Sequence, residues 1–195
     1  MTKQALRRSK KIDDILASAV GAFRRHGYHG TSMEQIADQL LMTKGSLSYY
    51  FADKEEILFA IHDRALDHIL AELARVKRLA GCPCGRLEAL LSAHIGIMVE
   101  GFHGTGLALE FGALSAPRLR TVVAKRDRYE AGLRALIEQG VRKGCLRPVD
   151  PKMAGLALLG AINWIARWYR PDGSTKPAEL ARSFREILLG GLLPR

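Results

Sequence analysis

The sequence lacks the features that mark membrane, secreted or disordered proteins. No apolar run in its 195 residues reaches the roughly 18 residues that a membrane-spanning helix needs. No apolar stretch follows the charged N-terminal residues MTKQALRRSKK, so we expect no secretory signal, no membrane partner and a cytoplasmic location. Hydrophobic residues make up 48% of the chain and charged residues 26%, which predicts a globular fold with a substantial core.

Cysteine is scarce, with only Cys82, Cys84 and Cys145 in the chain. An odd number in a cytosolic protein does not suggest a disulfide framework. The Cys-Pro-Cys spacing differs from the Cys-x-x-Cys pairs of zinc sites, and no two histidines follow the spacing HxxxH. We therefore expect partly buried thiols near a turn, with neither a structural metal nor a metal effector.

Signatures of common enzymes are absent as well. The glycines of residues 101–106 do not follow a predicted strand, so this segment does not qualify as a nucleotide-binding loop. No Gly-x-Ser-x-Gly motif occurs, and no pattern brings cysteine, histidine and carboxylate side chains together. We expect no catalytic residues and no cofactor.

Acidic residues are the minority among the charged groups. Lysine and arginine number 30 against 20 aspartates and glutamates, a net charge of +10 that favours polyanionic partners such as nucleic acid. At the N-terminus the excess lies before the first acid, Asp13, in Lys3, Arg7, Arg8, Lys10 and Lys11. Two interpretations of this basic tail stay open: it contacts DNA, along the backbone or in the minor groove, or it is a disordered solubilising tail.

Helical periodicity recurs along the whole chain, without convincing strand alternation, and predicts an all-α fold of about nine helices. The first helix is expected from about residue 8 to 26, ended by Gly27. A short helix should follow two overlapping capping boxes, Thr31 with Glu34 and Ser32 with Gln35, and another should follow Thr43. Six more are predicted over residues 53–80, 85–101, 105–113, 117–143, 151–170 and 174–190.

Two short helices behind a longer amphipathic one are typical of a helix-turn-helix, whose second helix enters the major groove of DNA. Residues that can donate to phosphates or base edges lie on and around these helices. They are Thr31, Ser32, Lys44, Ser46, Ser48, Tyr49, Tyr50 and Lys54. By periodicity alone, a compact helical hairpin with solvated polar residues is an equally open interpretation.

Residues 15–58, ILASAVGAFRRHGYHGTSMEQIADQLLMTKGSLSYYFADKEEIL, strongly resemble the DNA-binding region of the TetR family of transcriptional regulators. The matching features keep the family's order and spacing. They are Phe23, Gly27-Tyr28, Thr31-Ser32, Ile36-Ala37, Lys44-Gly45-Ser46-Leu47, Tyr49-Tyr50-Phe51 and Lys54-Glu55. The resemblance implies a three-helix DNA-binding domain in residues 1–52 and a helical ligand-binding and dimerisation domain in residues 53–195.

The resemblance also implies roles for single residues. Gly45 joins the DNA-contacting set, because a side chain there would crowd the DNA, and Lys54 would contact phosphate. Thr31 and Ser32 would cap the second helix and touch phosphate. Many members of the family have an aromatic residue where this chain has Ser48, so Ser48 would reach less far.

The last helices are apolar over more than one face. The apolar residues of the two segments are Met153, Leu156, Leu158, Leu159, Ile162 and Ile165, and then Ile187, Leu188, Leu189, Leu192 and Leu193. A helix that is apolar on several sides must be buried on several sides. Pairing with a second subunit, which the resemblance implies, would achieve this and would suit a palindromic operator; a monomeric core is the alternative.

The segment NWIARWYRP, residues 163–171, is similar to one in TetR-type regulators of fatty-acid and steroid catabolism, whose effectors are coenzyme A thioesters. Indoles stack on flat rings, and guanidinium groups bind phosphates. The predicted effector contacts are Trp164, Arg167, Trp168, Arg170, Arg118 and Arg120. The structural alternative, with both tryptophans in a dimer core and the arginines capping helix ends, stays open.

Together these patterns predict a homodimeric repressor that leaves its operator when a small effector binds, with an acyl-CoA thioester as the candidate effector. Two other functions fit the same residues. One is a DNA-binding protein of this fold that organises the chromosome, and the other is a regulator of efflux that responds to a hydrophobic compound.

Overall fold

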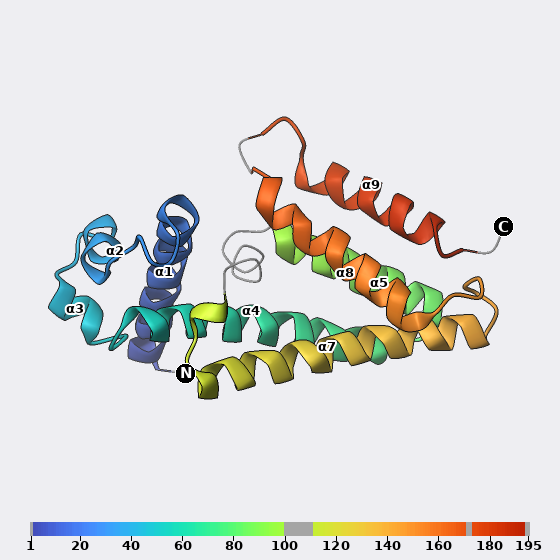
Figure 1. The fold of residues 1–195 in the computed structure, drawn as a ribbon, viewed down its shortest axis with the longest axis horizontal. Coiled ribbons are helices and arrows are strands. Elements are labelled where there is room, and N and C mark those ends of the chain that lie inside the picture. Colours follow the sequence, from blue (N-terminus) through green and yellow to red (C-terminus); the bar gives the residue numbers. More distant parts are fainter. Residues whose placement is uncertain (1, 100–110, 171–172, 194–195) are drawn as a thin grey trace.

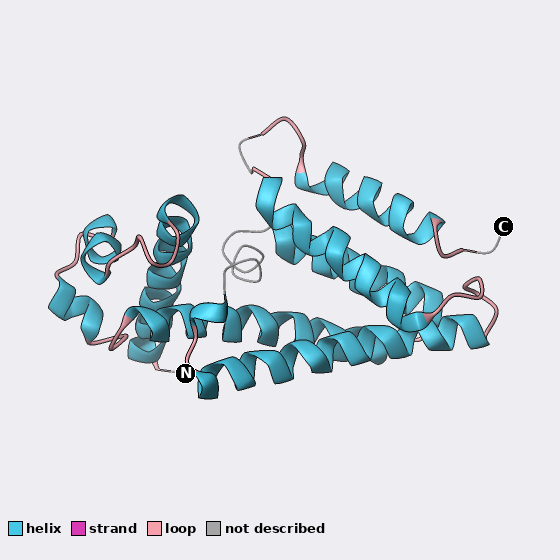
Figure 2. Cartoon of the chain, in the orientation of Figure 1, coloured by secondary structure: helices cyan, strands magenta, loops and turns pink. Residues whose placement is uncertain are grey.

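The computed structural model describes residues 2–99, 111–170 and 173–193. Within these ranges the chain forms eight α-helices and one short 3-10 turn, with no strand (Figure 1 and Figure 2). The all-α prediction is confirmed, and the helix number is close to the predicted nine. Of the helix predicted over 105–113, only η1 (Phe111–Ala113) lies in the described part, and the glycines of 101–106 lie outside it. No helix in the described part is long and apolar enough to cross a membrane.

Three helices gather at one end of the molecule: α1 (Lys3–His26), α2 (Met33–Gln39) and α3 (Lys44–Ser48). Their fully buried side chains include Leu16, Ile36 and Leu47, which share one core with the start of α4 (Lys54–Lys77). An ion pair between Asp13 of α1 and Arg64 of α4 adds a polar contact beside that core.

Helix α1 begins at Lys3, earlier than its predicted start near residue 8. Thr2 caps it, since its side-chain oxygen accepts a hydrogen bond from the Ala5 amide. The basic residues of the N-terminus therefore lie on a helix, and the prediction of a disordered tail is wrong for residues 3–11. The prediction that these residues contact DNA stays open.

The remaining helices form a bundle around α5 (Pro83–Val99), which packs against four neighbours. Helix α4 runs from the three-helix end into this bundle and lies along α7 (Ala116–Arg142) (Figure 1). Helices α8 (Pro151–Trp168) and α9 (Pro177–Gly190) each pack on α5. Because α4 belongs to both groups of helices, the boundary predicted at residues 52 and 53 divides packing that is continuous.

The predicted helix starts and stops are largely confirmed. Asp53 and Asp150 cap α4 and α8 by accepting backbone N–H groups, and Gly27 and Gly144 follow α1 and α7 with positive φ angles of 72° and 70°. The last helix begins at Pro177 rather than near 174, because proline occupies its first turn and Lys176 precedes it.

The expectation for the cysteines is wrong. Cys84 and Cys145 form a disulfide with a Cα–Cα distance of 6.2 Å, and Cys82 is the exposed free thiol. The partners lie 61 residues apart, at the first turn of α5 and just after α7. They meet because α5 and α7 pack together, which neither the odd number of cysteines nor their local spacing could indicate.

The Cys84→Ser substitution should lower the stability of the oxidised protein. The cross-link closes a 61-residue loop, and the chain-entropy model gives about 4 kcal/mol for a loop of that size. The melting temperature of Cys84→Ser should match that of the reduced wild type, whereas the matched control Cys82→Ser should melt like the oxidised wild type. Identical melting of the two variants under oxidising conditions would contradict the bridge.

Candidate nucleic-acid interface and effector cavity

The turn before α2 uses its two hydroxyl residues for different purposes. Ser32 caps α2 in a reciprocal capping box, with its side chain accepting from the Gln35 amide at 3.2 Å and its own amide donating to Gln35 Oε1 at 2.8 Å. Thr31 is buried, and its hydroxyl donates to the carbonyl of Gly27 at 2.8 Å. The predicted capping box of Thr31 with Glu34 does not form. Instead, the Thr31 hydroxyl stabilises the turn between α1 and α2 through its bond to Gly27.

Helix α3 buries one side and exposes the other. Thr43 caps it by accepting from the Ser46 amide at 3.1 Å, and Leu47 inserts into the core. The residues left exposed on and just after α3 are Lys44, Gly45, Ser46, Ser48 and Tyr49. Tyr50 is half-buried, and its ring lies 6.0 Å from the Arg8 guanidinium, which places the basic start of α1 beside the end of α3.

Gly45 occupies an open position on this exposed side. A Cβ atom there would lie 3.9 Å from the nearest heavy atom, Thr43 Oγ1. Its φ angle is not positive, so the backbone does not demand glycine. No contact or backbone angle in the described protein requires glycine at this position. This agrees with an external partner that approaches the backbone closely.

Lys44 is paired in the free protein. Its ammonium lies 2.7 Å from Glu34 Oε1, and both side chains are exposed. The hydrogen bond from Lys44 lowers the pKa of Glu34 to about 2, so the carboxylate is ionised at neutral pH. The pair joins α2 to α3, and DNA would have to compete with Glu34 for this lysine.

Lys54 is held by the protein more firmly than the sequence suggests. Its Nζ donates to the carbonyls of Tyr28 and Thr31, both at 2.7 Å, and lies 4.4 Å from the centroid of the Tyr28 ring. These contacts join the turn between α1 and α2 to the first turn of α4. Two of the three N–H donors of the ammonium are therefore occupied, and the predicted phosphate contact would need the third.

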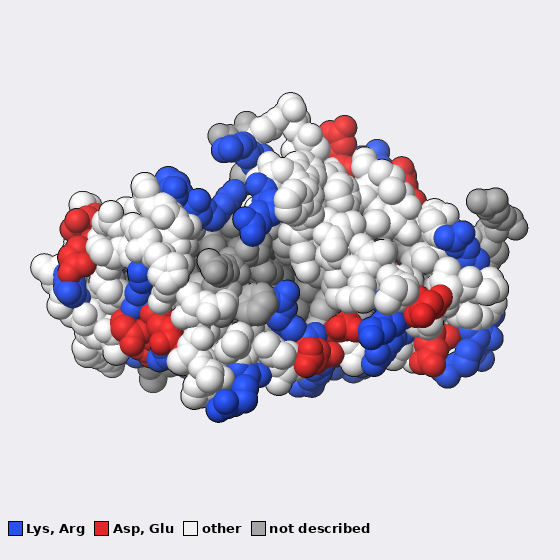
Figure 3. All heavy atoms as spheres, in the orientation of Figure 1, with Lys and Arg blue, Asp and Glu red and all other residues white. Residues whose placement is uncertain are grey.

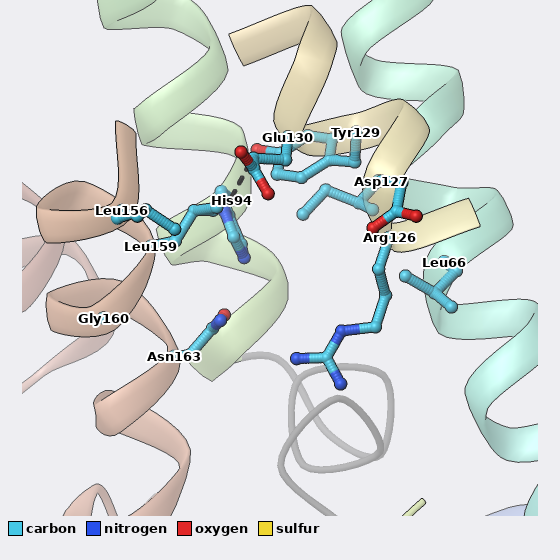
Figure 4. A pocket seen from close by; sticks show the side chains of 11 residues that line it. Leu66, His94, Arg126, Asp127, Tyr129, Glu130, Leu156, Leu159, Gly160 and Asn163 are labelled. Carbon is cyan, nitrogen blue, oxygen red and sulfur yellow. Dashed lines mark hydrogen bonds between the residues drawn. The ribbon is translucent and has the colours of Figure 1, made fainter. Parts of the chain in front are cut away.

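A cavity of about 370 Å³ lies in the bundle between α4, α5, α7 and α8 (Figure 4). Apolar side chains from α4 and α8 line it together with polar groups from α5, α7 and α8. The lining consists of Leu66, Ile69, His94, Arg126, Asp127, Tyr129, Glu130, Leu156, Leu159, Gly160 and Asn163. A pocket of this size and mixed lining suits a small ligand.

The cavity contains a buried pair that the sequence analysis did not predict. The Tyr129 hydroxyl lies 3.0 Å from His94 Nδ1, and both residues are almost fully buried. Burial lowers the pKa of His94 to about 3 and raises the pKa of Tyr129. A histidine and a tyrosine on the apolar faces of their helices were the only signal in the sequence.

The six predicted effector residues are not brought together. Trp164 and Trp168 are 63% and 43% exposed on α8, where Arg167 is also exposed. Arg170 is exposed just after this helix, and Arg120 is exposed on α7. Arg118 pairs with Glu55 at 3.3 Å and with Asp53 at 3.6 Å, near the start of α4. None of the six lines the cavity.

Helices α8 and α9 leave a set of large apolar side chains uncovered. Besides the two tryptophans it contains Met153, Leu156, Ile187 and Leu193. The surface over α8 shows few charged atoms in Figure 3. Several large apolar side chains that are exposed together on neighbouring elements are typical of an interaction surface.

Helix α2, packed through Ile36 and Ala37, and the exposed α3 that follows it define a helix-turn-helix protein. Helix α4 joins this part to a bundle with its own cavity. Residues 15–61 match the family model of bacterial regulatory proteins of the tetR family, and residues 81–192 match that of tetracyclin repressor-like C-terminal domains. Because the second match alone spans more than half of the chain, the chain belongs to the TetR family of transcriptional regulators.

Three relatives illustrate the similarity. The repressor KstR2 of Mycobacterium tuberculosis H37Rv is 25% identical over 183 residues, which cover 92% of this chain and 91% of KstR2. AibR, solved with isovaleryl coenzyme A and operator DNA, is 29% identical, with a TM-score of 0.79 over 90% of this chain and 96% of AibR. PfmR of Thermus thermophilus is 34% identical, with a TM-score of 0.81 over 93% of this chain and 99% of PfmR. KstR2 is a transcriptional repressor, PfmR is a TetR-family transcriptional regulator, and AibR was solved bound to operator DNA.

The Gly45→Ala substitution should weaken DNA binding without destabilising the protein. Alanine is favoured over glycine in a helix by up to about 1 kcal/mol, and the added methyl group would make only an ordinary van der Waals contact, 3.9 Å from Thr43 Oγ1. We expect an unchanged or higher melting temperature and at least about tenfold weaker binding, which corresponds to about 1.4 kcal/mol. Fluorescence anisotropy with a duplex selected by the wild type from a random library measures this.

Gly96→Ala in α5 is the matched control, because a Cβ at Gly96 clashes with no described atom either and meets none of them within 4 Å. Its affinity for the same duplex should equal that of the wild type. Wild-type affinity in Gly45→Ala would contradict a close approach of DNA at Gly45.

The Lys54→Met substitution keeps the aliphatic stem and removes the charge. Losing two hydrogen bonds from an ammonium group to carbonyls should lower the free energy of unfolding by about 2 kcal/mol, measured by urea denaturation. If Lys54 also contacts phosphate, the slope of log affinity against log salt should flatten by about one unit for every DNA sequence. An unchanged slope would reject the phosphate contact and leave the structural role alone.

Proposed function

We propose that the protein is a homodimeric repressor that binds a palindromic operator through two copies of α3 and is released by an effector in the bundle cavity. The exposed side of α3, with a glycine that the protein itself does not need, is the observation that carries this proposal. Ser32, Lys44, Ser46, Ser48 and Tyr49 can reach DNA as they stand, and Tyr50 in part, whereas the buried Thr31 acts through the turn that it holds.

A second copy of this chain is the proposed partner of the apolar faces of α8 and α9. Pairing these helices with their copies would bury Trp164, Trp168 and Ile187, which are 63%, 43% and 71% exposed in the single chain. This favours the structural alternative for the two tryptophans. A two-fold axis between the subunits would also present two α3 helices to successive major grooves, about 34–36 Å apart.

An acyl-CoA thioester is the proposed effector class. The relative AibR was solved with isovaleryl coenzyme A, and the cavity here offers apolar space for an acyl group. Its volume of about 370 Å³ is too small for a whole coenzyme, so the nucleotide would lie outside. Arg167 is exposed four residues after Asn163, which places it one helical turn beyond the cavity, where it can meet a phosphate.

Contacts at the start of α4 connect the cavity helices to the DNA-binding helices. Glu55 accepts a hydrogen bond from the Ser115 amide at 2.8 Å and pairs with Arg118, so the start of α7 is tied to the start of α4. Lys125 of α7 also pairs with Asp63 of α4 at 2.5 Å. An effector that moves α7 would shift α4 with it, favouring a spacing of the α3 helices that does not fit the operator.

A regulator of efflux that responds to a hydrophobic compound is the second candidate. The leucine side chains that line the cavity, such as Leu66 and Leu159, favour it. An assay that measures release of the protein from DNA, run with hydrophobic compounds and with acyl-CoA thioesters, separates the two effector classes. Genome-wide footprinting separates a regulator, with few sites near promoters, from a chromosome-organising protein, with many dispersed sites.

The Gly160→Leu substitution should produce a repressor that responds only to higher effector concentrations. A Cβ at Gly160 meets no described atom within 4 Å, so this lining position has room for a side chain beside the cavity. DNA affinity should stay within about twofold of wild type, while release by isovaleryl coenzyme A should need at least about tenfold more effector, or about 1.4 kcal/mol.

Ala131→Leu, on the exposed side of α7 and outside the cavity, is the control and should respond like the wild type. Sedimentation velocity on the same samples should give a dimer. A monomer that ignores every duplex at low salt would overturn the proposed function, and a normal response in Gly160→Leu would overturn the assignment of the effector to this cavity.

A further inference from the structure

The cavity holds one buried polar atom that its own surroundings do not satisfy. His94 Nε2 is fully enclosed and forms no hydrogen bond with any described residue. The ring lies between α5 and Asn163 of α8, inside the cavity (Figure 4). The Asn163 side chain lies close enough to the ring to favour its charged form as a hydrogen-bonding neighbour, but its geometry falls short of a hydrogen bond to Nε2. A buried polar atom left unpaired costs free energy, so a site of this kind is complete only with a partner.

The partner of Nδ1 determines what Nε2 can offer. Burial holds the pKa of His94 near 3, so the ring is neutral and carries a single proton. The Tyr129 hydroxyl has one hydrogen, and Nδ1 is its hydrogen-bond partner in the described structure. If Nδ1 carried the proton, the hydroxyl hydrogen would be buried without an acceptor. Tyr129 therefore donates to Nδ1, and Nε2 is an N–H donor facing the cavity.

The other lining residues indicate which acceptor fits this donor. The charged groups are Arg126, Asp127 and Glu130, which together give no positive excess, and the neutral histidine adds none. A carboxylate there would meet one guanidinium but two acids and an uncharged ring, so its desolvation cost would not be fully compensated. A neutral acceptor oxygen next to an apolar chain matches the N–H and the leucine side chains.

We propose that His94 Nε2 donates a hydrogen bond to the carbonyl oxygen of the effector's acyl group, and that Tyr129 is the positioning residue that fixes this tautomer. The inference rests on the proposed function, because it names the part of the effector that enters the cavity. The volume of about 370 Å³ equals about a dozen waters at about 30 Å³ each, so it holds a compact acyl group with its carbonyl.

The tautomer can be tested without any effector. In long-range ¹⁵N–¹H spectra of histidine-labelled protein, the His94 signal, assigned with His94→Leu, should show the proton on Nε2. In Tyr129→Phe, which keeps the ring and removes the hydroxyl, the same signal should move towards a mixture of tautomers. A proton on Nδ1 in the wild type would overturn the inference.

The carbonyl is tested with two probes that differ in one group. Isovaleryl coenzyme A has the thioester carbonyl, and its S-(3-methylbutyl) thioether analogue has a methylene in that place. By calorimetry the wild type should bind the thioester about tenfold more tightly, since a desolvated donor loses its acceptor in the thioether complex. His94→Leu should bind both probes equally, and Tyr129→Phe should keep less than about a third of the preference.

Tyr169→Phe is the matched control, because it removes a buried hydroxyl that has no partner in the described residues and lies outside the cavity. It should keep the wild-type preference. Equal wild-type affinity for both probes, with DNA released by both, would overturn this inference and leave the proposed function intact. Failure of a whole panel of acyl-CoA thioesters to bind would overturn the acyl effector and this inference together. The comparison of probes on the wild type does not depend on how any variant folds.

Discussion

The structure depends on one helix that belongs to both the DNA-binding end and the bundle. Helix α4 contributes Ile57 and Leu58 near the DNA-binding helices and Leu73 and Val76 deep in the bundle, all of them buried. A helix of 24 residues spans about 36 Å, so its two ends lie in different parts of the molecule. At its first turn, Lys54 donates to the turn before α2, and Glu55 accepts from the start of α7.

The two functional regions use polar side chains in opposite environments. On α3 the polar groups are exposed, and Lys44 is held only by a solvated ion pair with Glu34, which contributes little to stability and exchanges readily. In the cavity, His94 and Tyr129 are removed from water, where each hydrogen bond is stronger and each missing one more costly. The exposed groups on α3 suit a polyanion, whose phosphates can take the place of Glu34 beside Lys44. The buried pair in the cavity suits a small neutral group that is recognised by its shape and by one hydrogen bond.

Particular residues illustrate how far prediction from the sequence went. The helix starts at Ser32, Thr43, Asp53 and Asp150 were predictable, because a cap joins a side chain to a backbone amide two or three residues away. The second capping box failed because Thr31 is buried and donates to Gly27 instead. The six effector residues were chosen for their chemistry, and most of them lie on surfaces outside the cavity.

Local order in the chain was thus enough to establish the helical class, most helix ends and the exposed side of α3, since these depend on neighbours within a few residues. The Cys84–Cys145 bridge, the orientation of His94 towards Tyr129 and the cavity beside Gly160 arose only once distant helices had packed. Their physical origin is the meeting of particular helix faces in the bundle, and the position of a helix along its neighbour is set by the whole core rather than by any segment of it.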